Sequence, residues 1–133
     1  MATINRNQKQ FSDLDLLFQA HPYTSDVNRK FNLEAIKASV KNLILTKNYE
    51  RPFHPEIGTQ VTNMMFENYS PILRNTIEKS IMMSIERFEP RVRMISVDII
   101  ENQDTNEIMV DITFAPKNTD TPITITQTLG RLR

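Results

Sequence analysis

The polar and apolar positions of this chain follow two different periods, and each period predicts a different kind of element. From Asn32 to Thr46 apolar residues recur every three or four positions, which is typical of a helix with one buried face. This stripe consists of Leu33, Ile36, Val40, Leu43 and Ile44. A second stripe begins after Ser70-Pro71, a helix-start pair, and runs to about Phe88. Its members are Ile72, Leu73, Ile77, Ile81, Ile85 and Phe88.

A loop and a shorter helix are predicted between these two helices. Two prolines and a glycine in the segment 51–58 exclude a regular helix or a central strand, so we expect a structured loop there. Thr59 is a good N-cap residue type, and the apolar residues after it predict a short helix to about Glu67.

After Pro90 the period changes to two, which is typical of half-buried strands. On the first strand the pattern assigns to the core Arg93, Ile95, Val97 and Ile99. A polar turn over 101–106 leads to a second strand, whose core set is Ile108, Val110, Ile112 and Phe114. A third, Thr-rich strand follows, with Ile123, Ile125, Gln127 and Leu129 on one face. The sequence therefore predicts an α+β fold, with about three helices packed on a small, mainly antiparallel sheet of two to four strands.

The first 22 residues fit neither period. They are polar except for an apolar island, Phe11 to Phe18. They form either an arm with a short ordered piece or a disordered terminus, and the sequence does not choose between these. We expect residues 1–22 to be an N-terminal arm and 23–133 to be a single domain.

Composition excludes several classes of function. The 16 basic and 16 acidic residues give a net charge of +0, which argues against a nucleic-acid binder. There is no cysteine and thus no thiolate chemistry. No apolar run approaches the ~20 residues that a membrane span needs, and the polar start lacks the apolar segment of a signal peptide. We expect a protein of the cytoplasm that does not enter a membrane.

Candidate catalytic groups are sparse. His21 and His54 lack a second ligand at a metal-binding spacing, and two glycines in the whole chain do not make a phosphate loop. A carboxylate pair could hydrolyse a glycosidic bond, and the candidates are Glu50, Glu56, Glu67, Glu86 and Glu89. The alternative is that these carboxylates are solvated or paired with nearby arginines. The absence of Trp favours the alternative, because sugar sites use aromatic platforms. We predict no catalytic residue, no metal and no cofactor.

Two proline-centred segments carry unusual side chains. One is the loop from Arg51 to Gly58, and the other is Glu89-Pro90-Arg91, which places an acid and a base at a forced helix-to-strand corner. The physical pattern leaves two interpretations open for each segment, a docking surface or a plain structural connection.

The region from about Ile36 to Ile99 resembles the baseplate wedge subunits of contractile-tailed, T-even-type phages, a family shared with a type VI secretion baseplate component and often labelled lysozyme-like. The N-terminal run Ser12 to Asp15 is also similar to that family. The ordered motifs that carry the resemblance are Leu43-Ile44-Leu45-Thr46, Arg51-Pro52-Phe53-His54-Pro55-Glu56-Ile57-Gly58, Met65-Phe66-Glu67-Asn68, Ser70-Pro71 and Phe88-Glu89-Pro90-Arg91-Val92. One departure is Asn48-Tyr49-Glu50, where many relatives have a glycine; Asn48 tolerates left-handed geometry at modest cost.

The resemblance implies a sheath-initiating adaptor in the tail baseplate of a virion, assembled in the host cytoplasm. The implied contact with the helical core bundle of the wedge proteins is Glu89, Pro90 and Arg91. The implied brace beside it is the loop, through Arg51, Pro52, Phe53, Pro55, Glu56 and Gly58. The tail sheath would add strands at Ile123, Thr124, Ile125 and Thr126, and further expected partners are tail-tube or tube-initiator proteins. Two other readings stay open, a cell-wall hydrolase and a regulatory binding module on the same fold.

Overall fold

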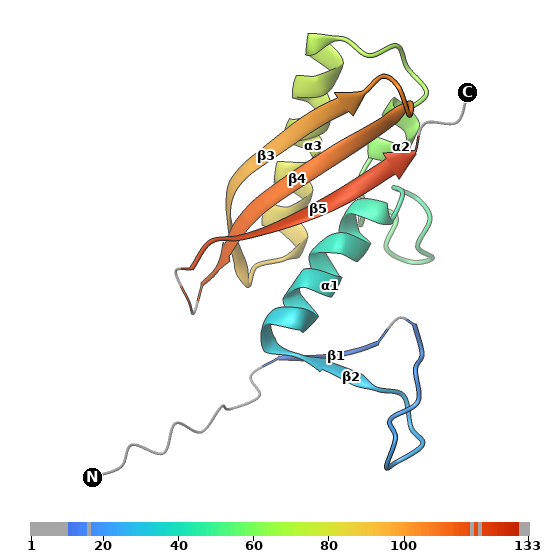
Figure 1. The fold of residues 1–133 in the computed structure, drawn as a ribbon, viewed down its shortest axis with the longest axis vertical. Helices are drawn as coiled ribbons and strands as arrows, with labels where there is room; N and C mark the ends of the chain where they lie inside the picture. The colour runs from blue at the N-terminus through green and yellow to red at the C-terminus, as the bar shows by residue number, and fades with distance from the viewer. Residues whose placement is uncertain (1–10, 16, 118, 120, 131–133) are drawn as a thin grey trace. The chain divides into compact units, whose positions relative to one another are not determined.

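A computed structural model describes residues 11–15, 17–117, 119 and 121–130, and it confirms the α+β class. Figure 1 shows the element order. The elements are β1 (Ser12–Leu14), β2 (Arg29–Phe31), α1 (Asn32–Leu45), α2 (Val61–Met64), α3 (Pro71–Phe88), β3 (Val92–Asn102), β4 (Glu107–Pro116) and β5 (Ile123–Gly130). The strands form two antiparallel sheets, β1-β2 and β3-β4-β5.

The chain divides into two compact units, Met1–Ala38 and Ser39–Arg133. In the smaller unit β1 pairs with β2, and the buried carboxylate of Asp15 lies 3.3 Å from the ammonium of Lys30. The predicted arm thus contributes a strand to a small sheet, although its residues 1–10 and 16 lie outside the described residues. The predicted boundary after residue 22 stays a prediction.

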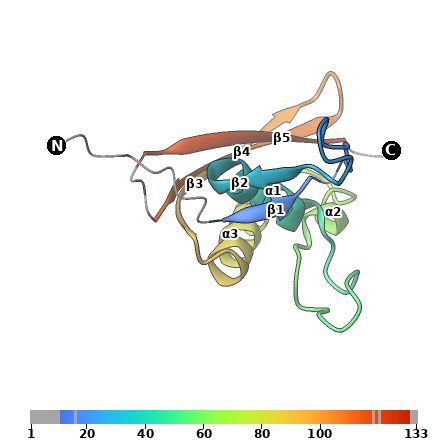
Figure 2. The same ribbon diagram turned by 90° about the horizontal axis from the view of Figure 1, so that it is seen from below.

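The core of the larger unit lies between α3 and one face of its three-stranded sheet (Figures 1 and 2). Every predicted core residue of β4 is at most 1% exposed, which confirms that strand's register. On α3 the buried positions are Leu73, Ile77, Ile81 and Ile85. The predicted helix start is also confirmed, because the Ser70 hydroxyl accepts a hydrogen bond from the Leu73 N–H at 3.1 Å. Ile72, predicted to be buried, is 79% exposed instead, because it directly precedes Leu73 and so points about 100° around the helix from it, outside the stripe that the other four define.

A β-bulge on β3 overturns half of that strand's predicted core. The register with β4 shifts between Met94 and Ser96, so Ile95 is an extra residue that inverts the alternation. After the bulge Val97 and Ile99 are buried as predicted. Before it the buried residue is Val92, and Arg93 is exposed; Ile95 is also exposed, at 46%.

Two further expectations around α1 and α2 need correction. Leu33, predicted to belong to the buried stripe of α1, is 37% exposed, whereas Val40, Leu43 and Ile44 are buried. Thr59 does not cap α2; Gln60 precedes that helix, and its side chain makes no capping hydrogen bond. The Thr59 hydroxyl instead donates to the carbonyl of Ile44 at 2.9 Å, because the chain returns here to the end of α1.

Candidate functional site

The corner between α3 and β3 is built around a buried acid. Glu89 ends α3, where its N–H donates to the Ile85 carbonyl at 2.8 Å, and its side chain is only 3% exposed. The Arg91 guanidinium donates two hydrogen bonds to this carboxylate, from Nε to Oε1 at 2.5 Å and from Nη2 to Oε2 at 2.7 Å. Ser39 of α1 donates a third, from its hydroxyl to Oε2. Such bidentate, charge-assisted pairs are the strong class of hydrogen bond, so the corner is held by three hydrogen bonds from two residues.

The environment of Glu89 keeps its carboxylate ionised. Burial alone would raise the pKa of Glu89, but the hydrogen bonds from Arg91 and Ser39 and the positive charge of Arg91 outweigh it, and the net pKa is lowered. A glycosidase acid needs the opposite, a carboxyl group whose pKa is raised. Glu89 is therefore a structural anion and not a proton donor.

The three residues of the predicted docking segment differ in what they offer to a partner. Glu89 faces inward, Arg91 is partly exposed (27% of its side chain), and Pro90 is exposed. An open hollow borders the exposed proline, and its lining residues are Glu86, Pro90, Val92, Arg93, Met94 and Lys117. The surface that a partner can reach at this corner thus includes Pro90, the exposed part of Arg91 and the hollow, while Glu89 lies beneath it.

The loop from Lys47 to Gly58 is closed at its base. The Thr59 N–H donates to the Thr46 carbonyl at 2.9 Å, and the Asn48 N–H donates to the Thr59 carbonyl at 3.3 Å. Gly58 is required at this closure, because its φ is +126° and an added Cβ would lie 2.6 Å from the Thr46 oxygen. The Gly58 carbonyl in turn accepts from the Ser84 hydroxyl of α3 at 3.0 Å.

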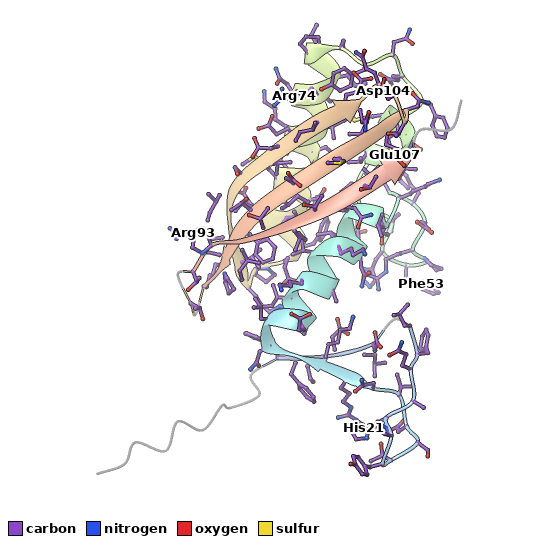
Figure 3. The ribbon with its side chains drawn as sticks, in the orientation of Figure 1. His21, Phe53, Arg74, Arg93, Asp104 and Glu107 are labelled. Carbon is purple, nitrogen blue, oxygen red and sulfur yellow. The ribbon has the colours of Figure 1, made fainter. Side chains whose placement is uncertain are left out.

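The predicted brace residues lie in different surroundings. Gly58 ties the loop to α3, and Glu56 lines an open hollow that the loop shares with α3. A hydrogen bond from the backbone lowers the pKa of Glu56, burial raises it, and His54, 3.5 Å from the carboxylate, and Arg87 lower it further, so the net pKa is lowered. Phe53 instead lies on the outer side of the loop (Figure 3), 96% exposed. The exposed remainder of the predicted brace is Arg51, Pro52 and Pro55.

The third predicted site, the last strand, lies at an edge of its sheet. β5 pairs with β4 on one side, and no strand within the described residues pairs with its other side. Thr124 and Thr126 are exposed, and Ile123 and Ile125 are half-buried. The two threonines bond across to β4, with Thr124 Oγ1 2.9 Å from Thr113 Oγ1 and Thr126 Oγ1 2.6 Å from Asp111 Oδ1.

Sequence reasoning missed the two serines that join these parts. Ser39 reaches Glu89, and Ser84 reaches Gly58. Each is a polar residue on a helix that also carries other polar residues, and neither lies at a special spacing from its partner. Only the fold brings them together, so the sequence held no signal for them.

The described part of the chain shows little sign of other chemistry. It holds no group of three or more His, Asp or Glu residues arranged to bind a metal ion. None of the helices in the described ranges has both the length and the apolar character of a membrane-spanning segment.

Comparison with known proteins gives a consistent result. The family model described as baseplate wedge protein gp25 matches residues 32–121. The baseplate wedge protein gp25 of Enterobacteria phage T4 is 34% identical over 115 residues, which cover 86% of this chain and 84% of that protein.

Two solved structures share the fold. A candidate tail lysozyme from Geobacter sulfurreducens has a TM-score of 0.68 at 19% identity, over 74% of this chain and 89% of the other. A chain of the anti-feeding prophage baseplate has a TM-score of 0.64 at 20% identity, over 92% of this chain and 87% of the other. At these identities the two structures establish a common fold and no common activity.

Proposed function

Because this chain belongs to the family of the baseplate wedge protein gp25, we propose that it is a structural adaptor of a contractile-tail baseplate, joining the wedge to the first ring of tail sheath and initiating sheath assembly. Its site of action is then the tail baseplate of the virion, after assembly in the host cytoplasm. The partners proposed for it are the wedge proteins, the sheath protein, and tail-tube or tube-initiator proteins.

The observation that carries the sheath contact is the unprotected edge of β5. Proteins usually protect a sheet edge with a charged residue, a proline or a bulge, because free N–H and C=O groups invite another strand. The eight residues Ile123–Gly130 contain no charged residue and no proline, and their register with β4 is unbroken. β3, the opposite edge, has both a bulge and charged side chains such as Arg93 and Asp98. The asymmetry favours β5 as the template for strand addition.

The wedge contact is proposed at the α3–β3 corner. Pro90 and the hollow beside it form an exposed surface whose backbone is held by the Glu89–Arg91 pair. A preformed surface of this kind loses little conformational entropy when a helical partner docks on it. Glu89 supports the contact from below, because its carboxylate is buried.

The alternative of a cell-wall hydrolase receives no support from the carboxylates. The pKa values of Glu56 and Glu89 are both lowered, which makes them poor general acids at neutral pH. No feature of the described residues favours the regulatory module over the adaptor.

Hydrogen exchange tests the sheath contact directly. The amides of β5 that face the free edge should exchange fast in the isolated chain, and they should become protected when the sheath protein of the same particle is added. The β4 amides, bonded on both sides, provide the internal control. Unchanged exchange over 123–130 in a confirmed complex with sheath would show that the sheath binds elsewhere.

A further inference from the structure

The loop between α1 and α2 carries two aromatic residues that are exposed to solvent and have strained backbone angles. Tyr49 is 82% exposed and Phe53 is 96% exposed, and their φ angles are +68° and +69°. Large side chains rarely adopt such left-handed backbone, because the Cβ atom crowds the carbonyl oxygen. Their exposure means that burial within this chain does not offset the strain. Backbone strain that no packing within the chain offsets is often found at functional surfaces.

The backbone around these aromatics is already organised. The Tyr49 N–H donates to the Pro55 carbonyl at 2.8 Å across the loop, and the Lys47 N–H donates to the Glu50 carboxylate at 2.9 Å. Together with the closed base at Thr46 and Thr59, these bonds make a compact Ω-type loop, and Figure 2 shows it projecting away from the sheet. The tip needs little further ordering in order to bind.

We propose that the loop tip, defined as Tyr49, Arg51 and Phe53, is a further docking point, which inserts its aromatics into an apolar pocket rimmed by carboxylates on a neighbouring protein of the same assembly. Arg51 is exposed, and no described residue forms an ion pair with it. The Glu50 carboxylate is held by the Lys47 N–H at the base of the loop, and the Glu56 carboxylate lies beside His54. Arg51 is the one charged residue of the tip as defined, and an acidic rim complements it. Exposed aromatics and Arg are the residue types that contribute most at protein interfaces.

Two other occupants fit the tip less well. A second copy of the chain would need a self-complementary patch, because a two-fold interface pairs the same surface on both copies. Two projecting tips are not complementary in shape. A membrane surface is held by several basic residues acting together, whereas the tip offers Arg51 alone. A protein pocket is the occupant that matches both the shape and the charge.

Asparagine substitutions separate binding from folding, since asparagine adopts left-handed backbone readily. Tyr49→Asn and Phe53→Asn should leave the thermal unfolding midpoint unchanged or raise it, while each weakens binding to the complex of the particle's own wedge proteins at least tenfold. The matched control is Phe66→Asn, an exposed aromatic outside the tip (62% exposed), which should bind as the parent chain does. Unchanged binding of either tip variant, or a fall in midpoint that accounts for the loss, would overturn the proposal.

A photo-crosslinker identifies the occupant. With p-benzoylphenylalanine at position 53 in assembled baseplates, crosslinks should map to an apolar segment of another protein that has Asp or Glu beside it. Crosslinks to a second copy of this chain, or to lipid, would contradict the proposal. The docking role of the tip rests on the proposed adaptor function, and different results would contradict each of them. If the parent chain does not bind wedge proteins, the adaptor function fails, whereas equal binding by the parent and Phe53→Asn removes only the docking role of the tip.

Discussion

Ser39 and Glu89 lie 50 positions apart in the sequence, yet the hydroxyl of Ser39 donates a hydrogen bond to the buried carboxylate of Glu89. With the Arg91 guanidinium on the same carboxylate, this contact ties α1 to the corner where α3 turns into β3. The corner therefore depends on two segments that are distant along the chain, α1 and the α3–β3 turn. Its stability and its proposed docking role can be separated by choosing which of these residues to change.

Arg91→Ala should destabilise the fold as well as any complex. It leaves the Glu89 carboxylate buried without its cation, and breaking such a pair costs about 2–4 kcal/mol here, slightly less than for a fully enclosed pair because part of Arg91 reaches water. Chemical denaturation would measure the change in the free energy of unfolding. The control is Arg74→Ala on the exposed side of α3, expected to change it by less than about 0.5 kcal/mol. A variant of Arg91 as stable as the parent would show that the pair adds little to folding.

Acid should weaken the fold through Glu89. Its pKa in the folded chain lies below the ordinary 4.5, so the folded state binds the proton less readily than the unfolded state does. The stabilisation is thus fully present above the unfolded pKa, and it is lost as the pH falls through the folded pKa. Unfolding measured in urea between pH 7 and pH 3 should show a fall below about pH 4.5. Glu89→Gln should be less stable at neutral pH, and its free energy of unfolding should fall less steeply with decreasing pH. Parallel pH curves for the variant and the parent chain would show that Glu89 is not the cause of the acid sensitivity.

Alanine should destabilise the chain at Gly58 but not at Gly130, its other glycine. Gly58→Ala should cost at least about 1 kcal/mol, because its φ of +126° is unfavourable for any Cβ and the added atom would meet the Thr46 carbonyl. Gly130→Ala is the matched control, since an added Cβ there meets nothing within 4 Å. Thermal unfolding of both variants is the measurement. Equal midpoints would mean that the loop base relaxes to accept a side chain.

Pro90→Ser tests the wedge contact without touching the Glu89–Arg91 pair. It removes an exposed apolar ring at the corner, so binding to the particle's wedge proteins should weaken about tenfold, or 1.4 kcal/mol. The unfolding midpoint should move by only a few degrees, because Pro90 is exposed. Pro122→Ser changes another exposed proline and should leave wedge binding intact. Calorimetric titration gives both affinities, and equal values would move the wedge contact away from this corner.

Local patterns were enough to predict the parts of the fold whose physics is local. The Ser70-Pro71 start, the alternation of β4 and the buried stripe of α3 at Leu73, Ile77, Ile81 and Ile85 follow from capping and periodicity, and each is confirmed. The phase of β3 does not follow, because the bulge at Ile95 depends on pairing with β4. A one-residue insertion exchanges the buried and exposed faces for the strand residues before it. The prediction that Arg93 lies in the core is wrong for this reason.

The candidate sites divide in the same way. The sequence identified Glu89-Pro90-Arg91 as unusual, but not that Glu89 faces inward, because its burial depends on Ser39 and Arg91 closing around it. The prolines and the glycine predicted a rigid loop. The sequence did not show which of its residues anchor the loop and which project into solvent. That distinction depends on Ser84, which reaches the loop from α3.

The open edge of β5 also bears on how the chain behaves outside a particle. An uncharged strand with unpaired N–H and C=O groups can pair with another copy of itself as readily as with a sheath subunit. The net charge of +0 supplies no long-range repulsion to keep copies apart. Concentrated preparations of the free chain should therefore aggregate, most of all near the isoelectric point of about 6.7. If the chain acts as the proposed adaptor, prompt binding of the newly made chain by its partners would protect it from this aggregation.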